Sequence, residues 1–131
     1  MLNVVDERNI ETTRGDILPL TVVALDENKQ KEYEFKTGDV LRFKITKAKD
    51  MKAVLLQKDF EILEPTFEKE IVIEADEMKI GSISSKAVDY WYEIELNPDT
   101  KYTRTIIGYS KEEGPALLTL LPEGGDKVDK E

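Results

Sequence analysis

Large apolar residues recur at every second position in several segments of this chain. In residues 18–24, 41–45 and 90–96 they fall on one alternating set of positions. Successive side chains of a β-strand point to opposite faces, so each segment predicts a strand with one face toward a core and the other toward water. This alternation is typical of half-buried antiparallel strands, and it restricts the chain to a fold built from sheets.

Turn-forming residues separate these segments. Gly15-Asp16 precedes the first, Gly38-Asp39 precedes the second, and Asn97-Pro98-Asp99 follows the third. Weaker alternation predicts further strands at residues 10–13, 54–60, 67–73, 102–109 and 117–121. About seven or eight short strands at this spacing predict an all-β fold, a sandwich or a barrel.

One segment, residues 75–80, does not alternate. We expect Asp76 to cap a single helical turn there, with Glu77 near its positive end. The turn lies just before a strand that carries two tyrosines. We expect Tyr90 or Tyr92 to pin the corner at which the chain passes between sheets.

The length of 131 residues suits one domain. We predict a single β-sandwich domain over residues 1–121. Residues 122–131 contain Gly124-Gly125 and mostly charged side chains, so they have too little apolar surface to offset the entropy of ordering. We therefore predict a flexible acidic C-terminal tail.

The amino-acid composition excludes several kinds of chemistry. The chain has no cysteine and no histidine, so disulfides, thiolate nucleophiles, imidazole bases and zinc-finger sites are excluded. A formal net charge of −9 argues against nucleic-acid binding, which depends on neutralising phosphates. No apolar run suggests a membrane span or a signal peptide. We expect no enzymatic activity and no cofactor.

Two motifs suggest sites but are better explained as ordinary structure. The acidic pairs Asp26-Glu27, Asp76-Glu77 and Glu112-Glu113 lack the alternating spacing that wraps a calcium ion, so we expect no metal site. Arg14-Gly15-Asp16 is the tripeptide that integrins recognise. With no signal peptide and no cysteine, we expect it to form a turn.

A group of lysines lies near the end of the second strand. They are Lys44, Lys47, Lys49 and Lys52. No aromatic residues are interleaved with them and acidic residues surround them, which disfavours nucleic-acid binding. We expect a solvated strand edge on which lysine blocks pairing with other chains.

The shared phase of the strands predicts a core. Its expected members are Leu20, Phe43, Ile45, Tyr92 and Ile94.

Trp91 is the only tryptophan, and alternation places it on the face opposite this core. Either a loop or lysine stems cover it, or it is a contact with another subunit, because tryptophan is enriched among interface anchors.

Four segments, taken in order, resemble a known family. They are residues 14–16 with the strand that follows, 38–43, 90–96 and 105–109. Their arrangement resembles the immunoglobulin-like domain of phage and prophage baseplate upper proteins and related small virion proteins, over roughly residues 12–122. The polar stretch 111–115 before the last strand departs from that pattern. The resemblance implies an immunoglobulin-like antiparallel β-sandwich, and it offers no catalytic residues.

The resemblance also implies a role. We expect a structural protein of the phage or prophage particle, from the baseplate, the tail or the head decoration, made in the bacterial cytoplasm. Its expected partners are other virion proteins or copies of itself, in a possible homo-oligomer, and neither nucleic acid nor a membrane. The alternative is a small carbohydrate-binding module, which needs exposed aromatic side chains such as Trp91, Tyr102 or Tyr109. A hydrolase that uses paired carboxylates has the least support.

Overall fold

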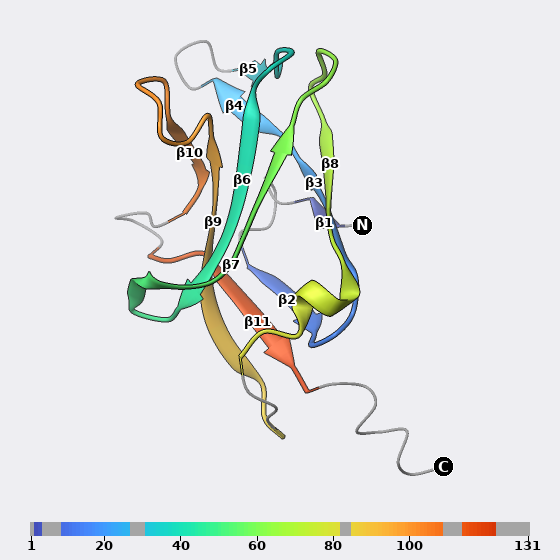
Figure 1. Ribbon diagram of the computed structural model, residues 1–131, viewed down its shortest axis with the longest axis vertical. Coiled ribbons are helices and arrows are strands. Elements are labelled where there is room, and N and C mark those ends of the chain that lie inside the picture. The colour runs from blue at the N-terminus through green and yellow to red at the C-terminus, as the bar shows by residue number, and fades with distance from the viewer. Residues whose placement is uncertain (1, 4–8, 27–30, 82–84, 109–113, 123–131) are drawn as a thin grey trace.

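The computed structural model describes residues 2–3, 9–26, 31–81, 85–108 and 114–122, with eleven strands and one short helix among them (Figure 1). The elements are β1 (Leu2–Asn3), β2 (Ile10–Thr13), β3 (Leu18–Val22), β4 (Ala24–Asp26), β5 (Lys31–Tyr33), β6 (Val40–Lys47), β7 (Asp50–Glu61), β8 (Lys69–Ile73), the 3₁₀ helix η1 (Ala75–Met78), β9 (Val88–Leu96), β10 (Arg104–Ile107) and β11 (Leu117–Leu121).

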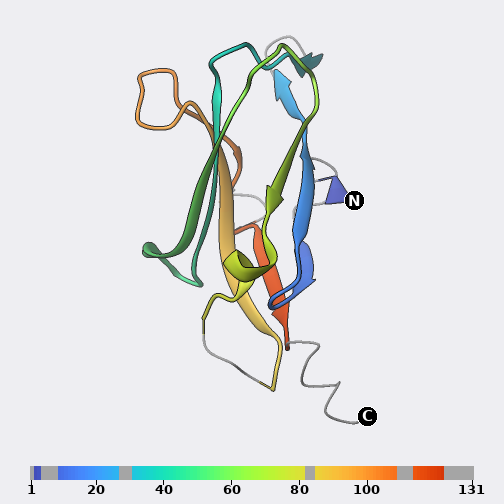
Figure 2. The same ribbon diagram turned by 45° about the vertical axis from the view of Figure 1, so that its right-hand side comes forward.

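Two sheets face each other in a β-sandwich (Figure 2). The larger sheet has the order β2-β11-β9-β6-β7, with β10 also paired to β9, and the smaller has the order β1-β3-β8. The short β4–β5 hairpin is separate from both. The predicted all-β sandwich is confirmed.

The strand count and the pairing differ in detail from the expectation of seven or eight antiparallel strands. Two pairs, β1–β3 and β2–β11, are parallel. Both involve the N-terminal part of the chain, which contributes β1 to the smaller sheet and β2 to the larger. The extra strands include β1, β4 and β5, each only two or three residues long. Segments this short show too few alternations to be recognised from sequence.

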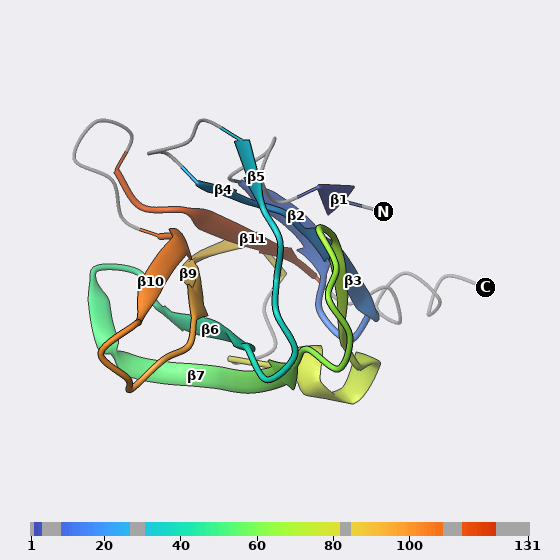
Figure 3. The same ribbon diagram turned by 90° about the horizontal axis from the view of Figure 1, so that it is seen from above.

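The core lies between the two sheets, which surround it when the molecule is viewed from above (Figure 3). The five core residues named from the sequence are all buried: Leu20, Phe43, Ile45, Tyr92 and Ile94. The smaller sheet contributes Leu18, Leu20 and Val22 from β3, together with Ile71 and Ile73 from β8. Alternation is regular in β9, where every second residue from Tyr90 to Leu96 is buried, because one face of the strand packs against the core and the other faces away from it.

The corner between the sheets is built by η1 and Tyr90. Glu74, not Asp76, is the N-cap of η1: its carboxylate accepts from the backbone of Glu77, and the Glu77 carboxylate accepts from the backbone N–H of Glu74. Such a reciprocal box satisfies two N–H groups that the first turn leaves unpaired. The Tyr90 hydroxyl lies against Gly81, in the place that a Cβ would need. Tyr90 is thus the tyrosine that packs against the corner.

Lys58 links the two sheets along one open side of the sandwich. It lies on β7, the edge strand of the larger sheet, and it pairs in register with the buried Phe43, so it points inward. Its ammonium group donates to the Val72 carbonyl of β8 at 3.2 Å and to the Glu77 carboxylate at 2.8 Å. An inward-pointing charge on an edge strand opposes pairing with other chains.

Candidate functional site

Trp91 lies at the centre of a mainly apolar row that crosses the outer face of the larger sheet. The register pairs Trp91 with Thr46 on β6 and with Leu117 on β11, and it pairs Thr46 with Val54 on β7. Residues directly opposite in antiparallel strands share a face. All four side chains therefore project away from the core, as the sequence predicted for Trp91.

The sheet is irregular on both sides of this row. On β7, the step from Val54 to Asp50 corresponds to a single step from Thr46 to Lys47 on β6. On the other side, β9 pairs first with β10 and then with β11. Ile107 pairs with Ile94, and Leu117 pairs with Trp91, only three residues away on β9. The chain between Ile107 and Leu117 is therefore much longer than continuous pairing would require. Bulges of this kind redirect side chains and are common beside functional sites.

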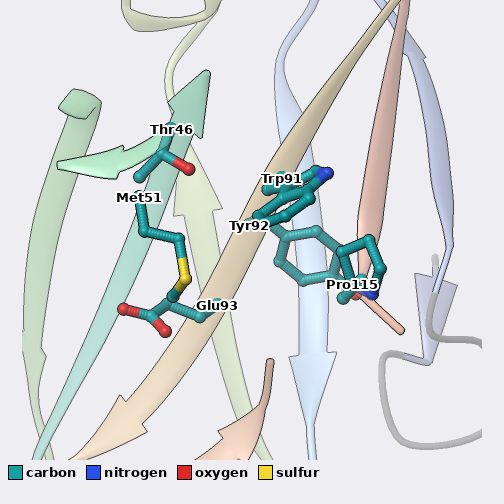
Figure 4. A pocket seen from close by; sticks show the side chains of 7 residues that line it. Thr46, Met51, Trp91, Tyr92, Glu93 and Pro115 are labelled. Atoms are coloured by element: carbon teal, nitrogen blue, oxygen red, sulfur yellow. The ribbon is translucent and has the colours of Figure 1, made fainter. Parts of the chain in front are cut away.

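These irregular segments help to form a small pocket beside Trp91 (Figure 4). It is lined by Thr46, Met51, Trp91, Tyr92, Glu93, Pro115 and Ala116. Its enclosed volume of about 10 Å³ is close to the space that one water molecule needs. Trp91 is half-buried, whereas Met51 and Val54 are 44% and 45% exposed. The pocket suits one small apolar group from a larger partner better than it suits a whole ligand.

A partly buried ion pair borders the pocket. The Lys44 ammonium lies 3.0 Å from the Glu93 carboxylate, and the two side chains are only 20% and 13% exposed. Gly108 lies close to this pair: a Cβ added there would lie 3.5 Å from the Glu93 Cβ, an ordinary contact, but only 2.8 Å from the Thr105 Cγ2. The charges of Lys44 and Glu93 are engaged with each other, which leaves the apolar surface as the distinctive feature of the site.

Further along the same face, Arg42 holds the ends of three elements together. Its guanidinium donates two hydrogen bonds to Asp59, at 2.8 and 3.1 Å, and one to Asp99 at 3.0 Å. These hydrogen bonds raise the pKa of Arg42 and, from the other side, lower the pKa of the Asp59 carboxyl. The network ties β6 to β7 and to the loop after β9.

The charges near the Trp91 row are distributed unevenly. The β6–β7 hairpin carries the exposed lysines Lys47, Lys49 and Lys52, none of which forms an ion pair with a carboxylate of the described residues. Two carboxylates are exposed on the same outer face: Asp89 on β9, the strand of Trp91, and Glu11 on β2, at the edge of the sheet opposite β7. The lysines were expected at a strand edge. Lys52 does lie on the edge strand β7, but Lys49 lies in the hairpin turn, and Lys44 and Lys47 lie on the interior strand β6.

The other sequence motifs lie away from this face. Arg14-Gly15-Asp16 forms a turn, as expected, and the Arg14 guanidinium donates to the carbonyl groups of Lys79 and Ile80. In the acidic pairs, Glu77 bonds to Lys58, while Glu27, Glu112 and Glu113 lie outside the described residues.

Over the described ranges, no three potential metal-ligating side chains come together, and no helix is long and apolar enough to cross a membrane.

Alternation placed Trp91 correctly, but it missed the rest of the site. Met51 and Pro115 reach the pocket only because the regular pairing is interrupted near them. The signal available in the sequence was the polar stretch 111–115, which lies just before the last predicted strand.

Comparison with known proteins gives no family: no protein-family model matches the chain, and no curated protein matches it significantly.

Proposed function

We propose that this chain is a non-enzymatic structural module that binds another protein through the outer face of its larger sheet, with Trp91 as the anchor. We place it in a phage or prophage particle, where its partners are other virion proteins or copies of itself. The location rests on the resemblance of the ordered segments 14–16, 38–43, 90–96 and 105–109 to virion immunoglobulin-like domains.

The observation that carries the binding role is the half-buried Trp91 in its apolar row. The Trp91 side chain is half-buried, and it borders a pocket whose rim includes the exposed Met51. A tryptophan that is already partly fixed loses little side-chain freedom when a partner covers it. Buried at the centre of an interface, such a residue contributes about 2 kcal/mol or more to binding.

The test compares the wild-type chain with Trp91→Ala in purified particles. A host that carries the encoding phage or prophage is induced, and the particles are separated on a density gradient. We expect the wild-type chain to sediment with particles and Trp91→Ala to remain in the soluble fraction with an unchanged far-UV circular dichroism spectrum. Tyr102→Ala is the matched control, because Tyr102 is a 68% exposed aromatic residue outside the pocket.

Two outcomes would overturn the proposal. If the wild-type chain is absent from purified particles, the virion location is wrong. If Trp91→Ala sediments with particles as well as Tyr102→Ala does, the anchor is wrong.

Carbohydrate binding is the second candidate, favoured by the partly exposed tryptophan beside polar side chains. A sugar needs hydrogen-bonding groups next to the aromatic face, but Lys44 and Glu93 already bind each other there. Binding of an oligosaccharide on a glycan array that is lost with Trp91→Ala would favour this candidate over a protein partner.

A further inference from the structure

We propose that the partner at the Trp91 face is a second copy of this chain, in a twofold dimer whose axis runs parallel to the strands of the larger sheet. This inference rests on the proposed function and names the partner. Two larger sheets would then pack through their outer faces, each burying the other's Trp91.

The strand order makes the face self-complementary in its apolar groups. Val54 and Met51 lie on the β7 side of Trp91, and Leu117 and Pro115 lie on the β11 side. A twofold axis parallel to the strands brings the β7 side of one copy against the β11 side of the other. Each apolar flank therefore meets the opposite apolar flank, and the same contact occurs twice.

The charges follow the same arrangement. The hairpin lysines Lys49 and Lys52 lie on the β7 side, and Figure 2 shows their hairpin bending away from the smaller sheet, toward the outer side. Glu11 lies at the other flank, on β2, and Asp89 lies on β9, two residues from Trp91. Thr119 of β11 pairs with both, and its hydroxyl donates to Asp89 at 2.7 Å. The same rotation brings the lysines of one copy to the carboxylates of the other, twice.

This local complementarity matters because the chain as a whole carries a net charge of −9. Two copies repel each other at long range, so association needs a surface on which unlike charges meet. Three exposed lysines without ion pairs among the described residues supply the positive half of such a surface in a chain that is otherwise acidic.

Sedimentation velocity of the full chain over a range of concentrations tests the dimer. We expect a monomer–dimer equilibrium that weakens with added salt, because the charged rim is screened. Trp91→Ala should abolish the dimer. Val54→Arg, at an exposed position of the same row, provides a second disruption if Trp91→Ala fails to fold.

Charge reversal distinguishes this arrangement from any other dimer. Lys49→Glu with Lys52→Glu, and separately Glu11→Lys with Asp89→Lys, should each raise the dissociation constant about tenfold, since every lost pair occurs twice. A mixture of the two double variants should form a heterodimer of near wild-type affinity, because one set of contacts is restored with the signs exchanged and the other keeps its native charges.

The outcomes separate this inference from the proposed function. A wild-type chain that stays monomeric at its highest soluble concentration, or charge variants whose mixture does not recover affinity, overturns the self-association proposal. If Trp91→Ala is still excluded from particles in either case, the face binds a different virion protein and the proposed function stands.

Discussion

Phe43 is the residue whose surroundings most directly report the packing of the two sheets. It is fully buried, with its ring 5.8 Å from that of Tyr92. Phe43→Ala removes most of a large buried side chain, and we expect it to lower the free energy of unfolding by about 3–5 kcal/mol in urea melts. Phe67→Ala is the matched control, because Phe67 is 46% exposed. Equal losses for the two variants would contradict the assigned core.

Glu77 gives the stability of the sandwich a pH dependence. A hydrogen bond from Lys58, followed by one from the Glu74 backbone, lowers the pKa of the Glu77 carboxyl. A carboxyl whose pKa is lower in the folded state stabilises the fold at any pH above its unfolded-state pKa, which is about 4.3 for glutamate. This stabilisation is lost as the pH falls from that value through the folded-state pKa.

Glu77→Gln should therefore be less stable than the wild type near pH 7, and the difference should shrink toward about pH 3, measured by thermal melts across that range. Glu70→Gln on β8 is the control, because Glu70 makes no ion pair with a described residue. A difference for Glu77→Gln that is the same at both ends of the range would exclude the Lys58–Glu77 contact as its cause.

At the scale of elements, the corner between η1 and β9 depends on Gly81. Its φ of +67° disfavours a side chain, and an added Cβ would collide with the Tyr90 hydroxyl. We expect Gly81→Ala to destabilise the fold by about 2 kcal/mol or more. Gly114→Ala should cost only about 1 kcal/mol, because Gly114 has a similar φ of +76° but nothing within 4 Å of its would-be Cβ.

A double variant separates the steric contact between Tyr90 and an added Cβ at residue 81 from the cost of the positive φ at that residue. Adding Tyr90→Phe to Gly81→Ala removes the hydroxyl and should recover part of the lost stability in the same denaturation series. If the two substitutions are simply additive, Tyr90 does not hold the corner through Gly81.

Lys58 opposes pairing of the edge strand β7 with other chains, and a substitution at this residue tests that role. Lys58→Ile leaves an apolar inward face on a twelve-residue edge strand, so we expect greater light scattering on heating. Gln57→Ile, the outward neighbour on the same strand, adds the same side chain without removing the inward charge. Equal scattering from both variants would mean that surface hydrophobicity alone, not the edge, causes aggregation.

At the scale of the whole molecule, residues 123–131 are expected to be dispensable. Val128 is their one apolar residue. Truncation after Pro122 should change the free energy of unfolding by less than about 1 kcal/mol in urea melts. A larger loss would mean that this segment packs on the domain.

The sequence by itself determined the longer strands and their buried faces, because the period of two depends only on neighbouring residues. β2 and β11 have the bounds predicted, and Phe43 and Tyr92 face inward as their phase required. The outward direction of Trp91 follows from the same period.

Only the tertiary structure decided which strands are neighbours, because pairing joins segments that are far apart in the chain. The parallel β1–β3 and β2–β11 pairs, and the inward turn of Lys58 toward Val72, depend on such contacts. So does the pocket beside Trp91. Alternation turned this side chain outward, but interruptions in the pairing of two other segments brought Met51 and Pro115 beside it.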